Sequence, residues 1–365
     1  MAAVFLNGRF LSQPVTGVQR FSAEIVAAID RLVASGEWPD TAVLMPPPAR
    51  AVLEQTQEPP ERRYPYLRLR KIGRTHGHLW EQMELPGAAR GRILVSLGNT
   101  APVLAGRRQV VVVHDAGIFD TPESYSLCFR TWYRTLLRGL VYAGAQVVTV
   151  SDFSRRRIAA HVDLPVTRIA VVHEGAEHIL RVAADPATLP RYGLRLRNYA
   201  LVVGSRVAHK NLATLSEATA LLRQRGMTIA VAGGADRDVF SGDVGAGSAE
   251  RRLGRVSDAE LRALYEGAAC LLFPSRYEGF GLPPVEAMAC GCPVLAGRGG
   301  AVEEICTDHA LYFDVTPHSV AGALACLLNE PALAEDLRQR GRAHAARLNW
   351  TASARALGAI VRDLQ

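Results

Sequence analysis

The sequence has few cysteines and no long apolar run, and both shortages exclude whole classes of protein. Its 6 cysteines are scattered and none forms a Cys-x-x-Cys pair, which argues against a disulfide framework and a cysteine metal site. No uncharged apolar run reaches the length that spans a membrane. The first residues lack the basic stretch and long apolar stretch of a signal peptide. We therefore expect a reducing, cytoplasmic location, with any membrane contact peripheral.

The composition indicates a folded protein with an anionic partner. Charged residues make up 21% of the chain, too few for disorder, and 48% of residues are hydrophobic. A chain of 365 residues fits two domains of ordinary size. The net charge of +7 favours a nucleotide, an acidic lipid surface or nucleic acid. Because we find no nucleic-acid recognition motif, we expect no nucleic acid among the partners.

Short apolar runs separated by helical stretches predict parallel sheets covered by helices on both faces. In the first half the expected strands are Val4–Leu6, Thr41–Met45, Ile93–Leu97, Val110–Val113 and Gln146–Val150. Asp185–Pro190 carries two prolines and no apolar periodicity, which predicts a linker. Beyond it the strand–loop–helix pattern starts again with Tyr199–Gly204, followed by strands at Thr228–Ala232 and Leu271–Phe273. We therefore predict an α/β protein with two Rossmann-like, doubly wound domains.

The most informative stretch is Ser275–Gly291, in which a strand leads through a glycine-containing loop into a helix. Gly279 and Gly281 let the backbone approach a ligand, and the helix N-terminus favours an anion such as a phosphate. Glu278 in the loop and Glu286, expected in the first turn of the helix, flank this anion site. Carboxylates accept hydrogen bonds from hydroxyls, so ribose or a sugar suits them. Taken singly, each is equally explained as a solvated or dipole-compensating glutamate.

Other candidates follow strands at the edge where parallel sheets bind their ligands. Arg206 and Lys210, after the first strand of the second half, would complement a diphosphate, or would simply be solvated. His114 follows a buried strand and would bond sugar hydroxyls or steady developing charge, unless it only holds its own loop. Gly17, at the start of a helix, leaves room for a phosphate or sugar beside backbone N–H groups.

Two basic clusters remain open to two interpretations. One is Arg62–Lys71, with Arg74 beyond it, and the other is Arg155–Arg157 near a helix start. Each is either a solvated face or a contact for an anionic partner, such as a polyprenyl diphosphate or the inner face of the cell membrane.

The string from Phe273 to Ala296 resembles the Glu-x7-Glu signature of retaining glycosyltransferases of the GT-B fold, in particular family 4, the glycosyl transferases group 1. Shorter stretches resemble bacterial members that assemble surface polysaccharides: Asn7–Leu11, Gly17–Arg20, His114–Ser126, Val148–Arg155 and Val171–Gly175. The family usually has asparagine where this chain has Glu174, which puts that turn contact in doubt. The resemblance runs from Asn7 to Trp350.

This resemblance implies a domain organisation. Residues 1–185 would form the acceptor domain and residues 191–348 the nucleotide-sugar donor domain. Residues 349–365 would form a C-terminal helix that returns to the first domain.

The resemblance also implies roles for the candidate residues. Glu286 would bind the ribose hydroxyls, and Glu278 would lie beside the donor sugar and diphosphate. Gly17 and His114 would face the donor sugar, and the backbone at Val256 would contact the base. The departing diphosphate would be stabilised by Arg206, Lys210 and the backbone N–H groups of Gly279, Phe280, Gly281 and Leu282.

The expected reaction transfers a hexose from a nucleoside diphosphate sugar to a hydroxyl, with retention at the anomeric carbon. We expect no covalent nucleophile, no cofactor and no metal, because the cations would stabilise the leaving group. GDP-mannose is the first expectation for the donor and a UDP-hexose the second. The acceptor would be a glycan or a polyprenyl-diphosphate-linked glycan. Two alternatives stay open: a sugar-nucleotide 2-epimerase of the same fold, and a non-catalytic nucleotide-sugar binding protein.

Overall fold

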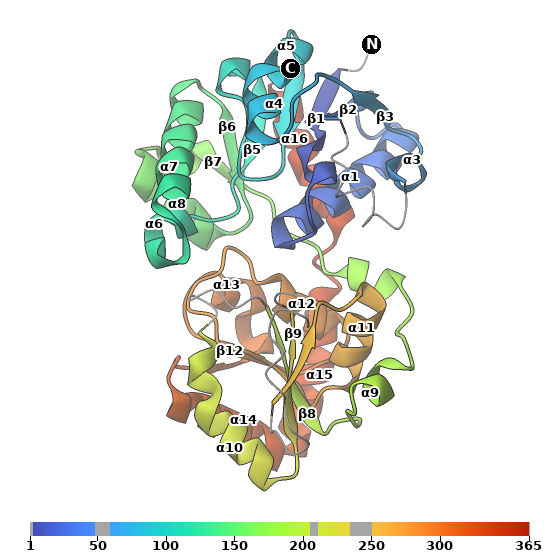
Figure 1. Cartoon of the computed structure of the whole chain (residues 1–365), viewed down its shortest axis with the longest axis vertical. Helices are drawn as coiled ribbons and strands as arrows, with labels where there is room; N and C mark the ends of the chain where they lie inside the picture. Colours follow the sequence, from blue (N-terminus) through green and yellow to red (C-terminus); the bar gives the residue numbers. More distant parts are fainter. Residues whose placement is uncertain (1–2, 48–58, 205–210, 234–249, 365) are drawn as a thin grey trace. The chain divides into compact units, whose positions relative to one another are not determined.

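The computed structural model describes residues 3–47, 59–204, 211–233 and 250–364. The chain forms two compact units (Figure 1). The first comprises Met1–Glu174 together with Trp350–Gln365, and the second comprises Gly175–Asn349.

The first unit is built on a seven-stranded parallel sheet with the order β3-β2-β1-β4-β5-β6-β7. Its strands are β1 (Val4–Asn7), β2 (Thr41–Met45), β3 (Arg68–Lys71), β4 (Ile93–Ser96), β5 (Gln109–Val112), β6 (Gln146–Thr149) and β7 (Ile169–Val171). The α-helices described in it are α1 (Gly17–Ala34), α3 (Pro60–Arg63), α4 (Gly77–Met83), α5 (Leu85–Ala88), α6 (Gly117–Asp120), α7 (Leu127–Tyr142), α8 (Asp152–Val162) and α16 (Trp350–Asp363). Every residue of β1, β2, β4 and β5 is buried, as expected when helices cover both faces of a parallel sheet.

The edge strand β3 explains much of the first basic cluster. Arg68 pairs with Asp40, and Arg63 donates to Glu24 at 3.0 Å. Charged side chains on an edge strand also hinder pairing with the edges of other molecules. The structure therefore gives this cluster a role in the fold itself.

The C-terminal helix α16 packs against α1, so the red end of the chain lies among the blue elements in Figure 1. Trp350 is fully buried and its ring meets Phe21 edge-on, with centroids 5.8 Å apart. Gly358 lies so close to Trp38 that a Cβ there would come within 2.7 Å of the indole ring. The tail is thus part of the core of the first unit.

The second unit contains a six-stranded parallel sheet with the order β10-β9-β8-β11-β12-β13. Its strands are β8 (Tyr199–Val203), β9 (Thr228–Ala232), β10 (Glu250–Gly254), β11 (Cys270–Phe273), β12 (Val294–Gly297) and β13 (Leu311–Phe313). The α-helices described in it are α9 (Thr188–Arg191), α10 (Ser216–Gln224), α11 (Asp258–Gly267), α12 (Leu282–Ala289), α13 (Val302–Cys306), α14 (Pro317–Asn329) and α15 (Pro331–Ala345). The predicted strands are present to within about one residue at each end, and β3, β7, β10, β12 and β13 are additions to them.

The segment that joins the two units is anchored to the second. The units divide between Glu174 and Gly175, ahead of the stretch Asp185–Pro190 that the prolines marked as a linker. The guanidinium of Arg262 donates to the carbonyls of Leu180 and Val182. The N–H of Asp185 donates to the carbonyl of Ala259. These bonds hold the joining segment against α11.

Candidate functional site

The loop between β11 and α12 is held in one conformation by a neighbouring glycine loop. Gly281 has φ 96°, a left-handed value, and a Cβ there would lie 3.0 Å from the Val302 side chain. Gly300, also left-handed with φ 68°, lies so close that a Cβ would come within 2.9 Å of the Glu278 nitrogen. The N–H of Ala301 donates to the Glu278 carbonyl at 3.2 Å. These contacts constrain the backbone of the loop.

The start of α12 corrects one detail of the sequence prediction, the position of Glu286. The helix begins at Leu282, so Pro283 and Pro284 are its second and third residues and Glu286 lies beyond its first turn. Because proline has no N–H, the first three positions offer only the N–H of Leu282. Donors for a phosphate must therefore come mainly from the backbone of the loop before the helix.

Glu286 is a buried carboxylate held at both oxygens. His178 Nε2 lies 2.8 Å from its Oε1, and the hydroxyl of Tyr265 donates to its Oε2 at 2.9 Å. Glu286 and His178 are each 6% exposed and Tyr265 is fully buried. Burial, and then the negative charge of Glu286, raise the pKa of Tyr265 well above its ordinary value, so the hydroxyl keeps its proton and acts as a donor.

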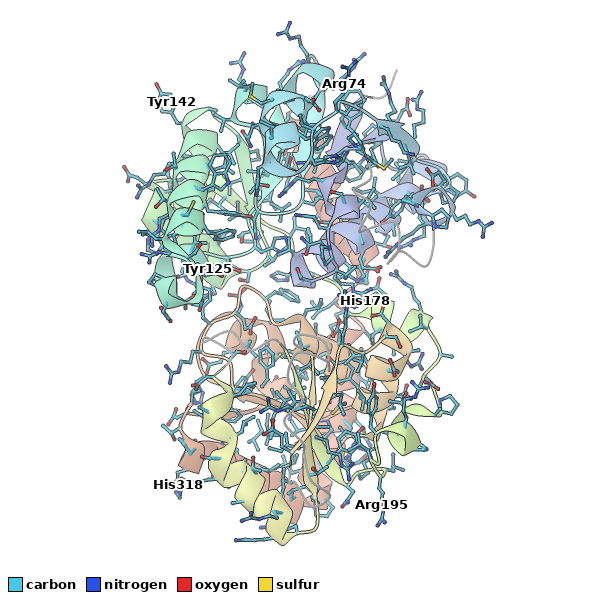
Figure 2. The ribbon with its side chains drawn as sticks, in the orientation of Figure 1. Arg74, Tyr125, Tyr142, His178, Arg195 and His318 are labelled. Atoms are coloured by element: carbon cyan, nitrogen blue, oxygen red, sulfur yellow. The ribbon has the colours of Figure 1, made fainter. Side chains whose placement is uncertain are left out.

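His178 and Tyr265 are functional candidates that the sequence did not reveal. His178, labelled in Figure 2, lies in a short 3₁₀ helix (Glu177–Arg181), and Tyr265 lies on α11. Neither lies in a recognisable motif, and both are far from Glu286 in the chain. Their role depends on tertiary packing alone.

The remaining donor-side candidates lie after two strands of the same parallel sheet. Glu278 is partly buried, and Gly279, Phe280 and Gly281 are buried in the loop after β11. Val256 lies between β10 and Ser257, which caps α11 in the predicted capping box with Glu260. Parallel strands end at one edge, so both groups of residues belong to that edge of the sheet. Arg206 and Lys210 lie outside the described residues.

In the first unit, His114 is buried, and protein groups contact its backbone N–H, both of its ring nitrogens and its ring. Its backbone N–H donates to Asn99 Oδ1 at 2.7 Å, and its Nε2 lies 2.9 Å from the Leu97 carbonyl. A carbonyl only accepts, so Nε2 carries a hydrogen. Nδ1 lies 3.6 Å from the carboxylate of Glu174, and Phe21 meets the ring edge-on at 4.7 Å.

Asn99 and Glu174 therefore join the list of residues that position His114. Asn99 has φ 65°, an unusual conformation for a residue other than glycine, and follows β4. Glu174 stands where the resembling family has asparagine, and it is 5% exposed. The departure from the family pattern thus places a second buried carboxylate beside a histidine.

Gly17 is the first residue of α1 and is exposed. A Cβ there would meet no atom within 4 Å. Neither packing nor a left-handed conformation requires glycine at this position. Open space beside the helix start is what the approach of a ligand would need.

The second basic cluster is largely neutralised within the first unit. Arg155 pairs with Asp152 at 2.5 Å, and Arg157 donates through Nε to Asp120 at 2.9 Å. His161 also lies 2.8 Å from Asp120. These pairs favour a role in holding α6 and α8 together.

The described residues contain neither a membrane-spanning helix nor a candidate metal cluster. In them, no helix combines the length and the apolarity needed to cross a bilayer. Nor do the described residues gather three or more His, Cys, Asp or Glu side chains in a way that would hold a metal ion.

The chain is similar in sequence to known glycosyltransferases. A family model described as "Glycosyl transferases group 1" matches residues 194–344. O-antigen chain mannosyltransferase B of Escherichia coli is 33% identical over 258 residues, which is 67% of each chain. A D-inositol 3-phosphate glycosyltransferase of Mycolicibacterium paratuberculosis is 31% identical over 304 residues, covering 79% of this chain and 66% of that protein. The matched part thus spans about two thirds of the length of these relatives.

Solved structures with the same fold cover nearly the whole chain. Anabaena HepE in complex with UDP superposes with a TM-score of 0.71 at 16% identity, over 100% of both chains. Sucrose-phosphate synthase of Thermosynechococcus elongatus gives 0.72 at 16% identity, over 99% of this chain and 98% of that one. At such identities the likeness concerns the fold alone. The predicted fold class, GT-B with two Rossmann-like parallel-sheet domains, is confirmed.

Proposed function

The chain belongs to the glycosyl transferases group 1 family, and from that premise we propose that it is a retaining hexosyltransferase. It takes a hexose from a nucleoside diphosphate sugar and transfers it to a hydroxyl of a glycan or lipid-linked glycan in surface polysaccharide assembly. The name of the Escherichia coli relative, an O-antigen mannosyltransferase, supports mannose as the sugar. GDP-mannose is the first candidate donor and a UDP-hexose the second.

The observation that carries this proposal is the held carboxylate of Glu286. His178 and Tyr265 each occupy one position on its two oxygens, and every carboxylate oxygen has a further lone pair. Two adjacent hydroxyls, such as those of a ribose, match two oxygens fixed in this way. Because the carboxylate is already desolvated and oriented, binding a ribose costs little further ordering.

The phosphates of the donor lie against the loop after β11 in this proposal. The N–H groups of Gly279, Phe280, Gly281 and Leu282 face the diphosphate, with Lys210 and Arg206 adding positive charge. Glu278 stands beside the sugar and the diphosphate. Loss of Lys210 lowers the rate by about a hundredfold or more, as for other preorganised anion sites.

The transfer proceeds on one face of the sugar. The bond from the anomeric carbon to the phosphate oxygen breaks while the acceptor oxygen bonds to that carbon from the same side. The released phosphate oxygen takes the acceptor's proton, so no covalent nucleophile and no metal take part. His114 and Gly17 face the donor sugar, and the backbone at Val256 contacts the base.

The setting of this reaction is part of the same proposal. The enzyme works in the cytoplasm, where nucleotide sugars are made, and meets lipid-linked acceptors at the inner face of the membrane. Any contact with that surface is peripheral and uses cations that the two basic clusters leave unpaired.

Two measurements test the proposal. A thermal-shift panel of GDP, UDP, ADP and dTDP identifies the base, and stabilisation by one nucleotide alone is expected. NMR of the donor with an acceptor then reports the anomeric configuration of the product. A new sugar nucleotide formed from the donor alone would show a 2-epimerase, and nucleotide binding without any turnover would show a binding protein.

A further inference from the structure

Three arginines of the second unit lie at the edge of its sheet where the parallel strands begin. Arg197 comes two residues before β8, and Arg338 and Arg342 lie one turn apart on α15. Helix α15 packs against α12, whose C-terminal end leads through Cys290 and Gly291 toward β12. The residues of the proposed donor site belong to the opposite edge, where the strands end. The three arginines are therefore separate from that site.

Arg342 is positioned by the end of α12. Its guanidinium lies directly against Gly291, which has φ 70° and leaves no room there for a Cβ. Nη2 of Arg342 donates to the carbonyl of Cys290 at 3.4 Å. This bond uses one of the five N–H groups of a guanidinium, and the other four make no hydrogen bond to the described residues. Arg342 is thus held in place with most of its donors unused.

Arg338 is more deeply buried and is only partly paired. Its side chain is 17% exposed, and its Nε is buried without a hydrogen-bond acceptor in the part of the chain that the structure describes. Nη1 donates to Glu335 at 3.4 Å, and the side chain of Glu335 is 57% exposed. A buried donor without an acceptor costs free energy, so this guanidinium suits an acceptor supplied by a ligand.

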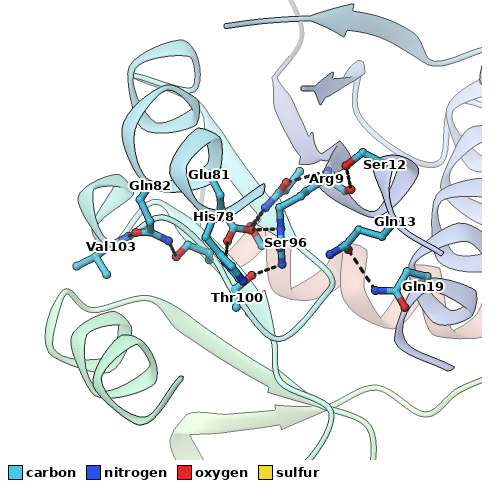
Figure 3. Close-up of polar contacts among 12 residues, drawn as sticks. Arg9, Ser12, Gln13, Gln19, His78, Glu81, Gln82, Ser96, Thr100 and Val103 are labelled. Carbon is cyan, nitrogen blue, oxygen red and sulfur yellow. Dashed lines mark hydrogen bonds and ion pairs between the residues drawn. The ribbon is translucent and has the colours of Figure 1, made fainter. Parts of the chain in front are cut away.

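A buried arginine of the first unit shows what fuller pairing looks like. Arg9 donates through Nε to Glu81 at 3.1 Å and through Nη2 to Thr100 at 2.6 Å (Figure 3). The side chain of Glu81 is 1% exposed, so water does not screen that ion pair. The acidic partner of Arg338, by contrast, faces solvent, where an ion pair contributes little. Arg338 therefore keeps more capacity to bind an anion than Arg9 does.

Arg197 adds a third positive charge. Its backbone has φ 58°, which is uncommon for a residue other than glycine and is often found at functional positions. Its guanidinium makes no hydrogen bond to any residue that the structure describes. The pKa of Arg197 lies below its ordinary value, first because of partial burial and then because of the charge of Arg338. Arg342 acts in the same direction and Glu335 opposes it, so these four side chains share one neighbourhood.

The charges of this cluster match a phosphate monoester. The three arginines and Glu335 carry three positive charges and one negative charge, a surplus of two. A phosphate monoester carries about −1.5 to −2 at pH 7 and offers three acceptor oxygens. Guanidinium groups bind such oxygens in pairs through their planar fork. A carboxylate or a phosphodiester carries a single negative charge and would leave one positive charge unmatched.

We propose that Arg197, Arg338 and Arg342 form a binding site for a dianionic phosphoryl group, separate from the donor site. The group belongs to inorganic phosphate, to a phosphate monoester in solution, or to a lipid whose headgroup ends in a phosphate monoester. It takes no part in sugar transfer. Because it bridges the start of β8, the end of α12 and α15, its binding stabilises the second unit. This inference does not depend on the proposed function.

The test titrates the full chain with anions that differ in charge. The protein is first saturated with its preferred nucleotide, so that the donor site is filled, and the ionic strength is held constant. Isothermal titration then compares inorganic phosphate and glycerol 3-phosphate with acetate and dimethyl phosphate. The two dianions should bind at least about tenfold more tightly, because each singly charged ligand leaves one cation unmatched.

Vesicle flotation distinguishes a lipid from a solute as the source of the phosphoryl group. Phosphatidylcholine vesicles contain either phosphatidic acid, a monoester, or phosphatidylglycerol, a diester. Flotation with phosphatidic acid alone, competed by inorganic phosphate, assigns the site to a lipid headgroup. Binding of the soluble dianions without flotation assigns it to a solute. Both results support the site.

Four variants assign the binding to this cluster. Arg338→Met should weaken phosphate binding about tenfold or more, whereas Arg338→Lys keeps the charge, loses the fork and should cost about threefold. Arg197→Asn keeps a residue that tolerates the left-handed backbone and should weaken binding about fivefold. Glu335→Gln removes the opposing charge and should tighten binding about threefold. Arg168→Ala, an exposed arginine of the first unit, is the charge-matched control and should change nothing.

Two results overturn the inference. One is equal affinity for the dianions and the singly charged ligands. The other is phosphate binding that Arg197→Asn and Glu335→Gln leave as unchanged as Arg168→Ala does. Both of these sites are exposed, so the two variants decide the matter even if Arg338→Met fails to fold. Failure of every nucleotide to bind contradicts the proposed function instead, and the phosphate titrations are then run without nucleotide.

Discussion

Each unit of the molecule buries one histidine beside one glutamate, and the two pairs are built in opposite ways. In the second unit His178 lies 2.8 Å from Glu286, and a tyrosine hydroxyl holds the other carboxylate oxygen. In the first unit His114 lies 3.6 Å from Glu174, while its other ring nitrogen is bonded to the Leu97 carbonyl. In the second unit the carboxylate of Glu286 accepts hydrogen bonds at both oxygens, whereas in the first unit it is His114 that is fixed by hydrogen bonds to other protein groups.

This difference indicates what each pair can offer a ligand. The carboxylate of Glu286 is positioned by two donors, His178 and Tyr265, and its oxygens can accept further hydrogen bonds from the hydroxyls of a ligand. His114 has its Nε2 hydrogen committed to a carbonyl, so its ring offers less to a ligand than Glu286 does. We infer that the pair in the second unit contacts the nucleotide through Glu286, whereas the pair in the first unit fixes the strand end at which His114 faces the donor sugar in the proposed function.

The largest expected effect comes from the held carboxylate itself. Glu286→Gln keeps the size of the side chain but loses the charge and one acceptor, so nucleotide affinity and kcat/KM should fall by about a hundredfold or more. Isothermal titration with the preferred nucleotide and a transfer assay measure the two quantities. His114→Gln is the counterpart in the first unit and should leave nucleotide affinity within about threefold, since it removes no acceptor from the ribose site. Equal losses of nucleotide affinity in the two variants would contradict the comparison.

A smaller effect is expected when the supporting member of each pair is changed. His178→Gln can still place an amide donor near Glu286, so nucleotide affinity should fall only about tenfold, with about 1–3 kcal/mol lost in the free energy of unfolding. Glu174→Asn introduces the residue usual in the family and should alter kcat/KM by about threefold or less, since the contact is longer. Chemical denaturation and steady-state kinetics report both. If Glu174→Asn lowered kcat/KM by a larger factor than His178→Gln lowered nucleotide affinity, the relative importance that we assign to His178 and Glu174 would be reversed.

Alanine substitutions of Gly281, in the second unit, and Gly17, in the first, should affect the free energy of unfolding differently. Gly281→Ala forces a left-handed residue and a contact with Val302, and should cost about 1–2 kcal/mol in the free energy of unfolding. Gly17→Ala meets open space in a helix and should be neutral or stabilising by up to about 1 kcal/mol. Thermal melts with and without nucleotide measure this. If Gly17 lies beside the donor sugar, its alanine variant raises the donor KM despite unchanged stability; an unchanged KM would remove Gly17 from the site.

No effect is expected from removal of divalent ions. Two pairs of carboxylates separated by a single residue occur in the sequence, Asp236-Arg237-Asp238 and Asp258-Ala259-Glu260. The first lies outside the described residues. In the second, Glu260 accepts from Ser257 and Arg191 and so serves as a cap and an ion pair. Transfer should continue in EDTA at its original rate, and a loss of turnover that magnesium or manganese restores would show that a metal takes part.

Much of the fold was predictable because its signals are local. Buried parallel strands read as short apolar runs, so Val110–Val113 and Leu271–Phe273 were placed correctly to within a residue. The motif around Glu278 and Glu286 indicated the family, which the comparisons confirm. The strand β3 was read only as a basic cluster, because charged residues on an edge strand do not look like a strand.

The supporting residues could not be predicted, since each reaches its partner across a long stretch of chain. Tyr265 and His178 come to Glu286 from α11 and from the segment after Gly175, and neither position carries a pattern of its own. The two prolines of α12, by contrast, already excluded most N–H groups at the helix start, and that consequence was readable from the sequence.

By itself, then, the sequence determined two parallel-sheet domains, the family, and a glycine loop followed by a helix that carries Glu286. Only the tertiary structure decided which side chains hold that carboxylate, which groups lie against the ring nitrogens of His114, and that Arg9 is paired with Glu81. The reason is physical: strand and turn preferences act between neighbours in the chain, whereas desolvation and hydrogen bonding of a buried charge depend on groups brought together by packing.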